Sequence, residues 1–152
     1  MSRQPVVARG EKGKPYFPDI WNVHFSLSHS GKYNACAFYE QPVGLDLQEH
    51  ISCNREAIAR RFFHPDEYSY LKRNGFAPFF QIWTAKESYV KQSGDGLSGM
   101  MKEFSVVDAG GLRQELNGVY FAYQSLPDAF SMCICACTIP DIRMKILEEP
   151  PS

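Results

Sequence analysis

The sequence contains neither a long apolar run nor an excess of one charge. No apolar segment reaches the length of about 18 residues that suggests a membrane-spanning helix, and residues 1–10 lack the apolar stretch of a secretory signal. We therefore expect a cytoplasmic protein with no membrane partner. The 152 residues include 16 Lys and Arg against 17 Asp and Glu, a net charge of −1. A general nucleic-acid-binding protein has a strong basic excess, so no nucleic-acid partner is expected.

Composition and length favour one folded domain. Apolar residues make up 44% of the chain and charged residues 22%, which excludes a disordered or fibrous protein. We expect a single domain over residues 1–152. Within it, residues 1–20 are rich in Gly, Pro and Lys and are expected to form an arm or loop, and residues 141–152 a loose tail.

The five cysteines do not suggest a disulfide framework, because their number is odd. Cys133, Cys135 and Cys137 alternate along one apolar segment. Residues i and i+4 of a strand lie about 13 Å apart, so these three thiols cannot converge on one zinc ion. They predict a small buried apolar face of a strand.

The apolar pattern predicts strands, then helices, then strands, an order typical of the α+β class. We expect an antiparallel sheet packed against a long helix, with the first strands forming a meander. Helix ends are indicated by Asn54 as an N-cap, by the His64-Pro-Asp-Glu67 start and by Gly94 as a stop. The expected strands are 23–28, 35–39, 43–47, 104–108, 112–116, 119–125 and 130–139, the expected helices 55–63, 65–74 and 78–92, and the expected hairpin turns Gly110-Gly111 and Asn117-Gly118.

Asp46 is a candidate ligand for a cation. It lies among apolar residues of an expected strand, where an unpaired carboxylate is costly. Gly44 leaves room for a ligand to approach the backbone, and Gln48 projects to the same face as Asp46, so the two could offer oxygens to one cation. The alternative is a carboxylate at a frayed strand end that pairs with an arginine.

The longest expected helix carries a second candidate pair. Glu87 and Lys91 stack at i,i+4 beside the apolar stripe, at the boundary of core and solvent. The alternative is an ordinary surface ion pair. Lys86 falls within the apolar stripe itself: either its stem snorkels to solvent or its ammonium meets a buried anion, and snorkelling is the expectation.

The segment Phe25-Ser-Leu-Ser-His-Ser-Gly31 ends an expected strand in short polar donors, which suits a phosphate group. Alternatively, His29 is an ordinary turn residue. A Ser–His hydrolase is excluded because no Gly-x-Ser-x-Gly elbow is present. Gly94-Asp-Gly-Leu-Ser-Gly99 matches a dinucleotide-binding motif, but it follows a helix and precedes a strand, the reverse of the required order.

Taken in order, these segments resemble 4′-phosphopantetheinyl transferases of the surfactin-synthetase type. The resemblance spans roughly residues 13 to 140, and each motif is weak alone but specific in combination. The matching motifs are Gly13-Lys-Pro15, Ser26-Leu-Ser-His-Ser-Gly31, Val43-Gly-Leu-Asp46, Arg61-Phe-Phe63, Glu67-Tyr68, Trp83-Thr-Ala-Lys-Glu-Ser88 with Lys91, Gly94-Asp-Gly-Leu97 and Phe104-Ser-Val106.

The resemblance implies transfer of the phosphopantetheine arm of coenzyme A to a serine of an apo acyl or peptidyl carrier protein, with release of 3′,5′-ADP. It implies Mg²⁺ bound by Asp46 and Glu87, with Gln48 at a position where this type often has Glu. Glu87 would also accept the serine proton, and Lys91 would hold a diphosphate oxygen. By the same resemblance Lys14, Ser28 and His29 contact phosphates of coenzyme A.

The chain resembles only the second half of such transferases, whose active site lies between two similar halves. Half a cleft leaves apolar surface exposed, so we expect a homo-oligomer. The alternative function is a catalytically impaired coenzyme A-binding module, or a subunit that requires a separate first-half chain.

Overall fold

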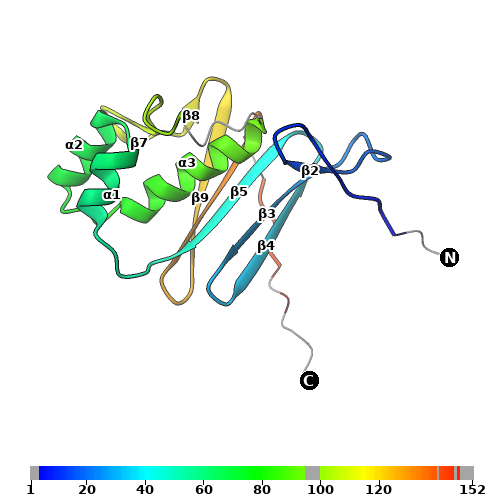
Figure 1. Cartoon of the computed structure of the whole chain (residues 1–152), viewed down its shortest axis with the longest axis horizontal. Coiled ribbons are helices and arrows are strands. Elements are labelled where there is room, and N and C mark those ends of the chain that lie inside the picture. The colour runs from blue at the N-terminus through cyan, green and yellow to red at the C-terminus, as the bar shows by residue number, and fades with distance from the viewer. Residues whose placement is uncertain (1–3, 95–99, 140, 146, 148–152) are drawn as a thin grey trace.

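The centre of the protein is an antiparallel sheet crossed on one face by a long helix (Figure 1). The computed structural model describes residues 4–94, 100–139, 141–145 and 147. The expected α+β architecture, an antiparallel sheet against a long helix, is confirmed. The four-stranded sheet has the order β5 (Val43–Glu49), β10 (Phe130–Ala136), β9 (Val119–Leu126) and β8 (Glu115–Leu116), and the helix is α3 (Phe79–Ser93).

Strands β3 (His24–Ser30) and β4 (Tyr33–Tyr39) form a separate hairpin beside β5. The expected meander is wrong at its third strand, since β5 pairs with β10. On the free edge of β5, serine hydroxyls of β3 take the place of the backbone hydrogen bonds that a paired strand would make. Each hydroxyl accepts a hydrogen bond from a backbone N–H of β5. The three bonds are Leu45 to Ser26 at 3.0 Å, Leu47 to Ser28 at 2.9 Å and Glu49 to Ser30 at 2.9 Å.

The two faces of β5 pack against different layers. Val43, Leu45 and Leu47 belong to an apolar cluster with β10 and the alanines and tyrosines of β4. Gly44 faces α3, where an added Cβ would lie 1.9 Å from the Ser88 carbonyl oxygen. The space at Gly44 is therefore filled by the backbone of α3, and the expectation of a ligand there is wrong.

The helices begin and end close to the expected residues. Helix α1 is Arg55–Phe62, with Asn54 accepting a hydrogen bond from the Ala57 backbone. Helix α2 is Pro65–Arg73, with His64 as its N-cap in a capping box. Helix α3 ends at Ser93 and is capped by Gly94, whose φ of 67° is the left-handed conformation that suits glycine.

The first strands after α3 are shorter than the sequence predicts. Of the segments 104–108 and 112–116, only β6 (Val107–Asp108), β7 (Gly111–Leu112) and β8 are strands. The Gly110-Gly111 turn is displaced, because Gly111 already pairs with Asp108. The Asn117-Gly118 turn is confirmed, with φ of 51° and 80° and strand pairing on both sides.

The cysteine prediction holds for two of the three alternating residues. Cys133 and Cys135 are fully buried in the core between sheet and helices. Cys137 is exposed, because β10 ends at Ala136 and the alternation does not continue. All five cysteines are free.

The expected N-terminal arm contains a short hairpin of β1 (Ala8–Arg9) and β2 (Pro15–Tyr16). Residues 141–145 have no helix or strand, although Ile142 packs on the cluster shared by β5 and β10. Residues 95–99 of the Gly94–Gly99 motif lie outside the described residues. Among the described residues, no helix has the length and apolar character needed to cross a membrane.

Candidate active site

Asp46 lies in the middle of β5 on the face that meets α3. Its Oδ1 accepts a hydrogen bond from Lys91 Nζ at 2.9 Å, and the Ser28 hydroxyl lies 3.4 Å from the same oxygen. Its Oδ2 is buried and has no hydrogen-bond partner among the described residues. Burial raises the pKa of Asp46, and the Lys91 ammonium opposes that rise. The residue thus presents one satisfied and one free oxygen.

Lys91 joins three segments around this carboxylate. Besides Asp46, its Nζ donates hydrogen bonds to the backbone oxygens of Leu45 at 3.0 Å and Leu27 at 3.3 Å. The ammonium therefore connects α3 to both β5 and β3. Its position depends on the close approach of α3 to Gly44, two residues before Asp46.

Glu87 lies one helical turn before Lys91 on α3. Burial raises the pKa of Glu87, the negative charge of Asp46 raises it further, and the Lys91 ammonium lowers it. The negative charge of Asp46 thus reaches Glu87. The structure brings together Asp46, Glu87 and Lys91 at the junction of β5 and α3.

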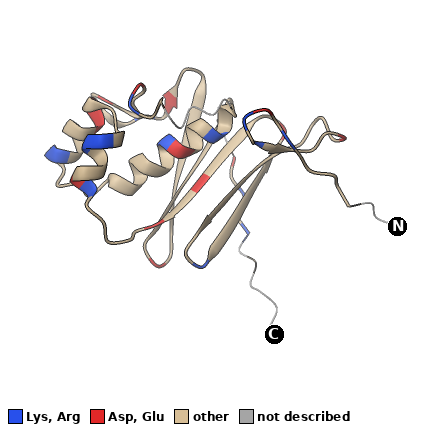
Figure 2. Ribbon diagram, in the orientation of Figure 1, with Lys and Arg blue, Asp and Glu red and all other residues tan. Residues whose placement is uncertain are grey.

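A cleft of about 420 Å³ opens beside this cluster. Its walls come from the N-terminal arm, the end of α3 and strand β3. Positive charge dominates the lining, which suits an anionic ligand. Residues that line it include Arg9, Lys12 and Lys14 of the arm, Glu87 and Lys91 of α3, and Leu27 of β3. In Figure 2, Lys and Arg occur on the arm as well as on α1, α2 and α3.

Arg9 and Lys12 were missed as candidates by reasoning from the sequence. Both are exposed and line the cleft, and Arg9 Nη1 donates to the Gly13 carbonyl at 2.9 Å. The available signal was the segment Arg9-Gly-Glu-Lys-Gly-Lys14, in which three basic residues occur with two glycines. A glycine-rich turn allows several cations to approach one ligand.

The Lys14 ammonium binds backbone carbonyl oxygens in the structure, whereas the expected partner was a phosphate. Its Nζ donates to the carbonyl oxygens of Lys91 at 2.6 Å, Val43 at 2.9 Å and Gln92 at 3.2 Å. Three acceptors account for all the hydrogens of an ammonium. Burial lowers the pKa of Lys14 to about 8. In this arrangement Lys14 holds the arm to the C-terminal end of α3, and its phosphate contact stays a prediction.

The remaining candidates lie around the cluster. Gln48 follows Asp46 on the same face of β5, and its amide nitrogen donates to the Glu49 carbonyl at 3.0 Å. Ser28 belongs to β3, and its hydroxyl accepts a hydrogen bond from the Leu47 backbone N–H of β5 at 2.9 Å. His29 is on the exposed side of β3, paired with Asn34 of β4. The ligand roles of all three stay predictions.

The donor set fits a hard divalent cation. Two carboxylates share the site, and the free, buried Oδ2 of Asp46 lacks a partner among the described residues. No group of three or more His, Cys, Asp or Glu side chains suited to a metal occurs in the described part of the chain. Mg²⁺ does not need one, because it is commonly bound by one or two carboxylates together with substrate phosphates and water.

Comparison with known proteins identifies the family of the chain. A family model described as the 4′-phosphopantetheinyl transferase superfamily matches residues 42–135, the segment that carries Asp46, Glu87 and Lys91. The 4′-phosphopantetheinyl transferase Sfp of Bacillus subtilis is 38% identical over 91% of this chain and 67% of its own length. A second B. subtilis 4′-phosphopantetheinyl transferase is 36% identical over 91% of this chain and 67% of its own length. The 4′-phosphopantetheinyl transferase gsp of Aneurinibacillus migulanus is 40% identical over 59% of this chain and 38% of its own length. The chain belongs to the 4′-phosphopantetheinyl transferase superfamily and to that enzyme class.

Proposed function

We propose that this chain transfers the 4′-phosphopantetheine arm of coenzyme A to a serine hydroxyl of an apo acyl or peptidyl carrier protein. The serine oxygen forms a bond to the phosphorus that bears pantetheine, the bond from that phosphorus to the other phosphate breaks, and 3′,5′-ADP leaves. The observation that carries the proposal is the convergence of Asp46, Glu87 and Lys91 beside a cleft with cationic walls.

In this proposal Asp46 and Glu87 hold Mg²⁺, and Gln48 contributes its amide oxygen to the ion or to its bound water. Bound Mg²⁺ would supply charge neutralisation to the diphosphate and the leaving phosphate. The buried Oδ2 of Asp46 has no hydrogen-bond partner in the described part of the chain, which supports this assignment because a buried carboxylate oxygen requires a donor or a cation.

Glu87 is proposed as the base that takes the proton of the attacking serine, directly or through water. A base is most effective when its pKa approaches the working pH. Burial and the neighbouring Asp46 raise the pKa of Glu87 in that direction. Lys91, one turn further along α3, would stabilise the negative charge on the diphosphate.

The cationic wall of the cleft is proposed to hold the phosphates of coenzyme A. Ser28, His29 and Lys14 are assigned to this task by resemblance to the family. Arg9 and Lys12 support it from the arm, since both line the same cleft and are exposed.

The free state of all five thiols supports placement in the reducing cytoplasm.

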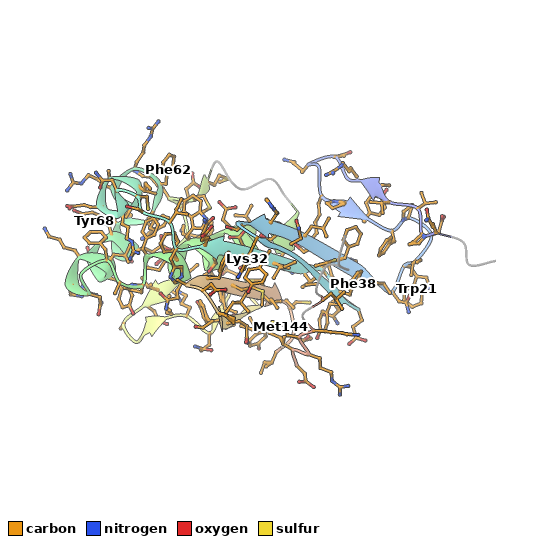
Figure 3. The ribbon with its side chains drawn as sticks, turned by 90° about the horizontal axis from the view of Figure 1, so that it is seen from below. Trp21, Lys32, Phe38, Phe62, Tyr68 and Met144 are labelled. Atoms are coloured by element: carbon orange, nitrogen blue, oxygen red, sulfur yellow. The ribbon has the colours of Figure 1, made fainter. Side chains whose placement is uncertain are left out.

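Self-association is proposed as the way the site is completed. Large apolar side chains are exposed in the β3–β4 hairpin and just before it: Trp21 is 88% exposed, Phe38 64% and Leu27 53%. Leu27 also lines the cleft, and Figure 3 shows Trp21 and Phe38 near one another at the same end of the molecule. A second copy that covered these residues would extend the cleft wall.

One observation favours a second candidate, a coenzyme A-binding module without transfer activity. The amide of Gln48 carries no charge, and Lys91 already neutralises Asp46 at 2.9 Å. This arrangement would bind an anionic ligand with less affinity for metal.

The deciding experiment mixes the purified chain with coenzyme A, MgCl₂ and an apo peptidyl carrier protein, and measures the carrier by intact mass spectrometry. We expect the carrier to gain one phosphopantetheine arm in a reaction that EDTA stops. Glu87→Gln and a carrier with its acceptor serine replaced by alanine are the controls. Binding of coenzyme A without any carrier modification would support the binding module instead.

A further inference from the structure

Lys86 and Glu67 form an ion pair that is fully enclosed in the protein. Both side chains are 0% exposed, and Lys86 Nζ lies 2.8 Å from Glu67 Oε1 and 3.0 Å from Oε2. Snorkelling, the expectation for Lys86, is therefore wrong, and the alternative of a buried anion holds. Lys86 immediately precedes Glu87, so this pair lies next to the candidate active site along α3.

The pair connects three separate segments. Lys86 donates to the Phe104 carbonyl at 2.6 Å and lies 4.0 Å from the centre of the Phe104 ring. Glu67 accepts backbone N–H groups from His64 at 2.8 Å and Val106 at 2.8 Å. Helix α3, the start of α2 and the segment that precedes β6 are thus hydrogen-bonded through two side chains.

A gain in folding stability does not explain why the protein contains this buried ion pair. Removing two charges from water costs several kcal/mol per ion, and well-packed apolar residues often replace a buried ion pair at no loss of stability. The neighbours of Lys86 on α3, Ile82 and Ala85, belong to the apolar core. What the ion pair adds over an apolar contact is direction, because its hydrogen bonds are satisfied in one orientation of the helix.

Orientation matters because successive side chains on a helix are about 100° apart. Fixing Lys86 inward toward Glu67 fixes Glu87 on the adjacent side of α3, and Lys91 one turn later on that same side. We propose that the Glu67–Lys86 pair is a positioning pair that sets the rotation of α3, so that Glu87 and Lys91 meet Asp46. The inference rests on the proposed transferase function for its catalytic consequence, but not for the contact it predicts.

The test compares the wild type with the double variant Lys86→Met/Glu67→Gln. Methionine keeps the length of the apolar stem, and glutamine keeps one acceptor oxygen for the capping backbone. Leu71→Ala is the matched control, because Leu71 is also buried on α2 but carries no charge. Each protein is measured for Tm, for kcat and KM in the carrier assay, and for the coupling between Asp46 and Lys91. That coupling comes from a double-mutant cycle of unfolding free energies with Asp46→Asn and Lys91→Met.

We expect the double variant to remain folded, to lose the Asp46–Lys91 coupling and to show kcat lowered by about 10- to 100-fold, the usual effect of displacing a supporting group. Leu71→Ala should lower Tm but keep the coupling and the kcat at temperatures where it is folded. A double variant with wild-type coupling and kcat would overturn the proposal.

Two other results, an unfolded double variant and an inactive wild type, can be distinguished from failure of the positioning proposal. If the double variant does not fold, Glu67→Asp serves instead, because it keeps both charges and shortens one side chain by one methylene. Its coupling and kcat should then fall, and unchanged values would overturn the proposal. If the wild type transfers nothing, the proposed function fails, and the coupling measurement alone decides whether the pair positions α3.

Discussion

Lys91 Nζ on α3 lies 2.9 Å from Asp46 Oδ1 on β5, although 45 residues separate the two in sequence. The carboxylate is mostly buried and the ammonium partly exposed, with 10% and 32% of the two side chains accessible. A cation therefore already neutralises one oxygen of Asp46, and the other oxygen is left for a second cation.

Replacing Asp46 with asparagine should remove transfer while leaving the fold intact. Asparagine keeps the size of the side chain but lacks the negative charge that a divalent cation requires. We expect kcat to fall by at least about 100-fold, comparable to the loss of one group that stabilises a transition state. Intact mass spectrometry of the carrier follows the rate, and circular dichroism checks the fold. Transfer at the wild-type rate would remove Asp46 from the site.

Glu87→Gln should be more stable than the wild type at neutral pH. Burial and Asp46 raise the pKa of Glu87 above its usual 4.5, so the folded chain binds this proton more tightly than the unfolded chain does. Its contribution to stability is present below the unfolded pKa and is lost as pH rises through the raised folded pKa. The Tm difference between variant and wild type should therefore be small at low pH and grow as pH rises.

The same substitution should lower kcat by about 10²–10⁴-fold, the range for loss of a general base. Stability and activity thus move in opposite directions at neutral pH. Lys102→Gln, an exposed charge change elsewhere, is the control for nonspecific charge effects. A Glu87→Gln protein with the same Tm as wild type at every pH would contradict the close approach of Glu87 to Asp46.

Substitution of Lys14 should lower stability, whereas substitution of Arg9 and Lys12 should raise the KM for coenzyme A. Lys14→Met leaves three carbonyl oxygens without their donor and should lower stability by about 1–3 kcal/mol. The pKa of Lys14 is lowered from 10.5 to about 8, so the unfolded chain binds more protons between these values. The wild type should therefore gain stability relative to Lys14→Met as pH rises through that window.

Arg9→Gln/Lys12→Gln should instead leave the Tm unchanged and raise the KM for coenzyme A. Both side chains are exposed and line the cleft, so their loss removes positive charge without removing packing. The effect should diminish at high salt, which screens exposed charges. If Lys14→Met alone raises the KM at an unchanged Tm, the phosphate role predicted for Lys14 is the correct one.

The elements of the fold were predictable where the signals are local. The Asn54 cap, the His64-Pro65 start and the Gly94 stop give the helix ends within one or two residues, because capping depends on neighbouring residues. The pairing of β5 with β10 was not predictable. It joins segments far apart in sequence, and the serines of β3 occupy the edge that a meander would have used.

The candidate site, too, was predictable only where the signals are local in the sequence. The i,i+4 spacing placed Glu87 beside Lys91, and alternation along β5 placed Asp46 with Gln48 on one face. The anion that meets Lys86 and the three carbonyls that meet Lys14 lie on distant segments. No pattern within a single segment indicates such a partner, so both side chains were assigned other surroundings.

Self-association should be visible in solution. Trp21 and Phe38 leave 88% and 64% of their surfaces exposed, and a copy of the chain that covered them would bury apolar area. Light scattering at micromolar concentration should report a mass above that of the 17.3 kDa chain. Trp21→Ser/Phe38→Ser should return the protein to the monomer with its Tm nearly unchanged at low concentration. Only monomer in the wild type would contradict the assembly.

Gly44→Ala should damage both the fold and the site. An added Cβ would lie 1.9 Å from the Ser88 carbonyl oxygen and 2.4 Å from the Gln92 backbone nitrogen, and backbone atoms of a helix cannot move away singly. Helix α3 must then shift from β5, and Lys91 loses its reach to Asp46. We expect a stability loss of about 1–3 kcal/mol, typical of overpacking, together with a fall in kcat. Gly10→Ala is the matched control, because its Cβ would make only an ordinary 3.7 Å contact with the Lys14 carbonyl oxygen. Wild-type kcat in Gly44→Ala would mean that the approach of α3 to β5 is not what brings the catalytic groups together.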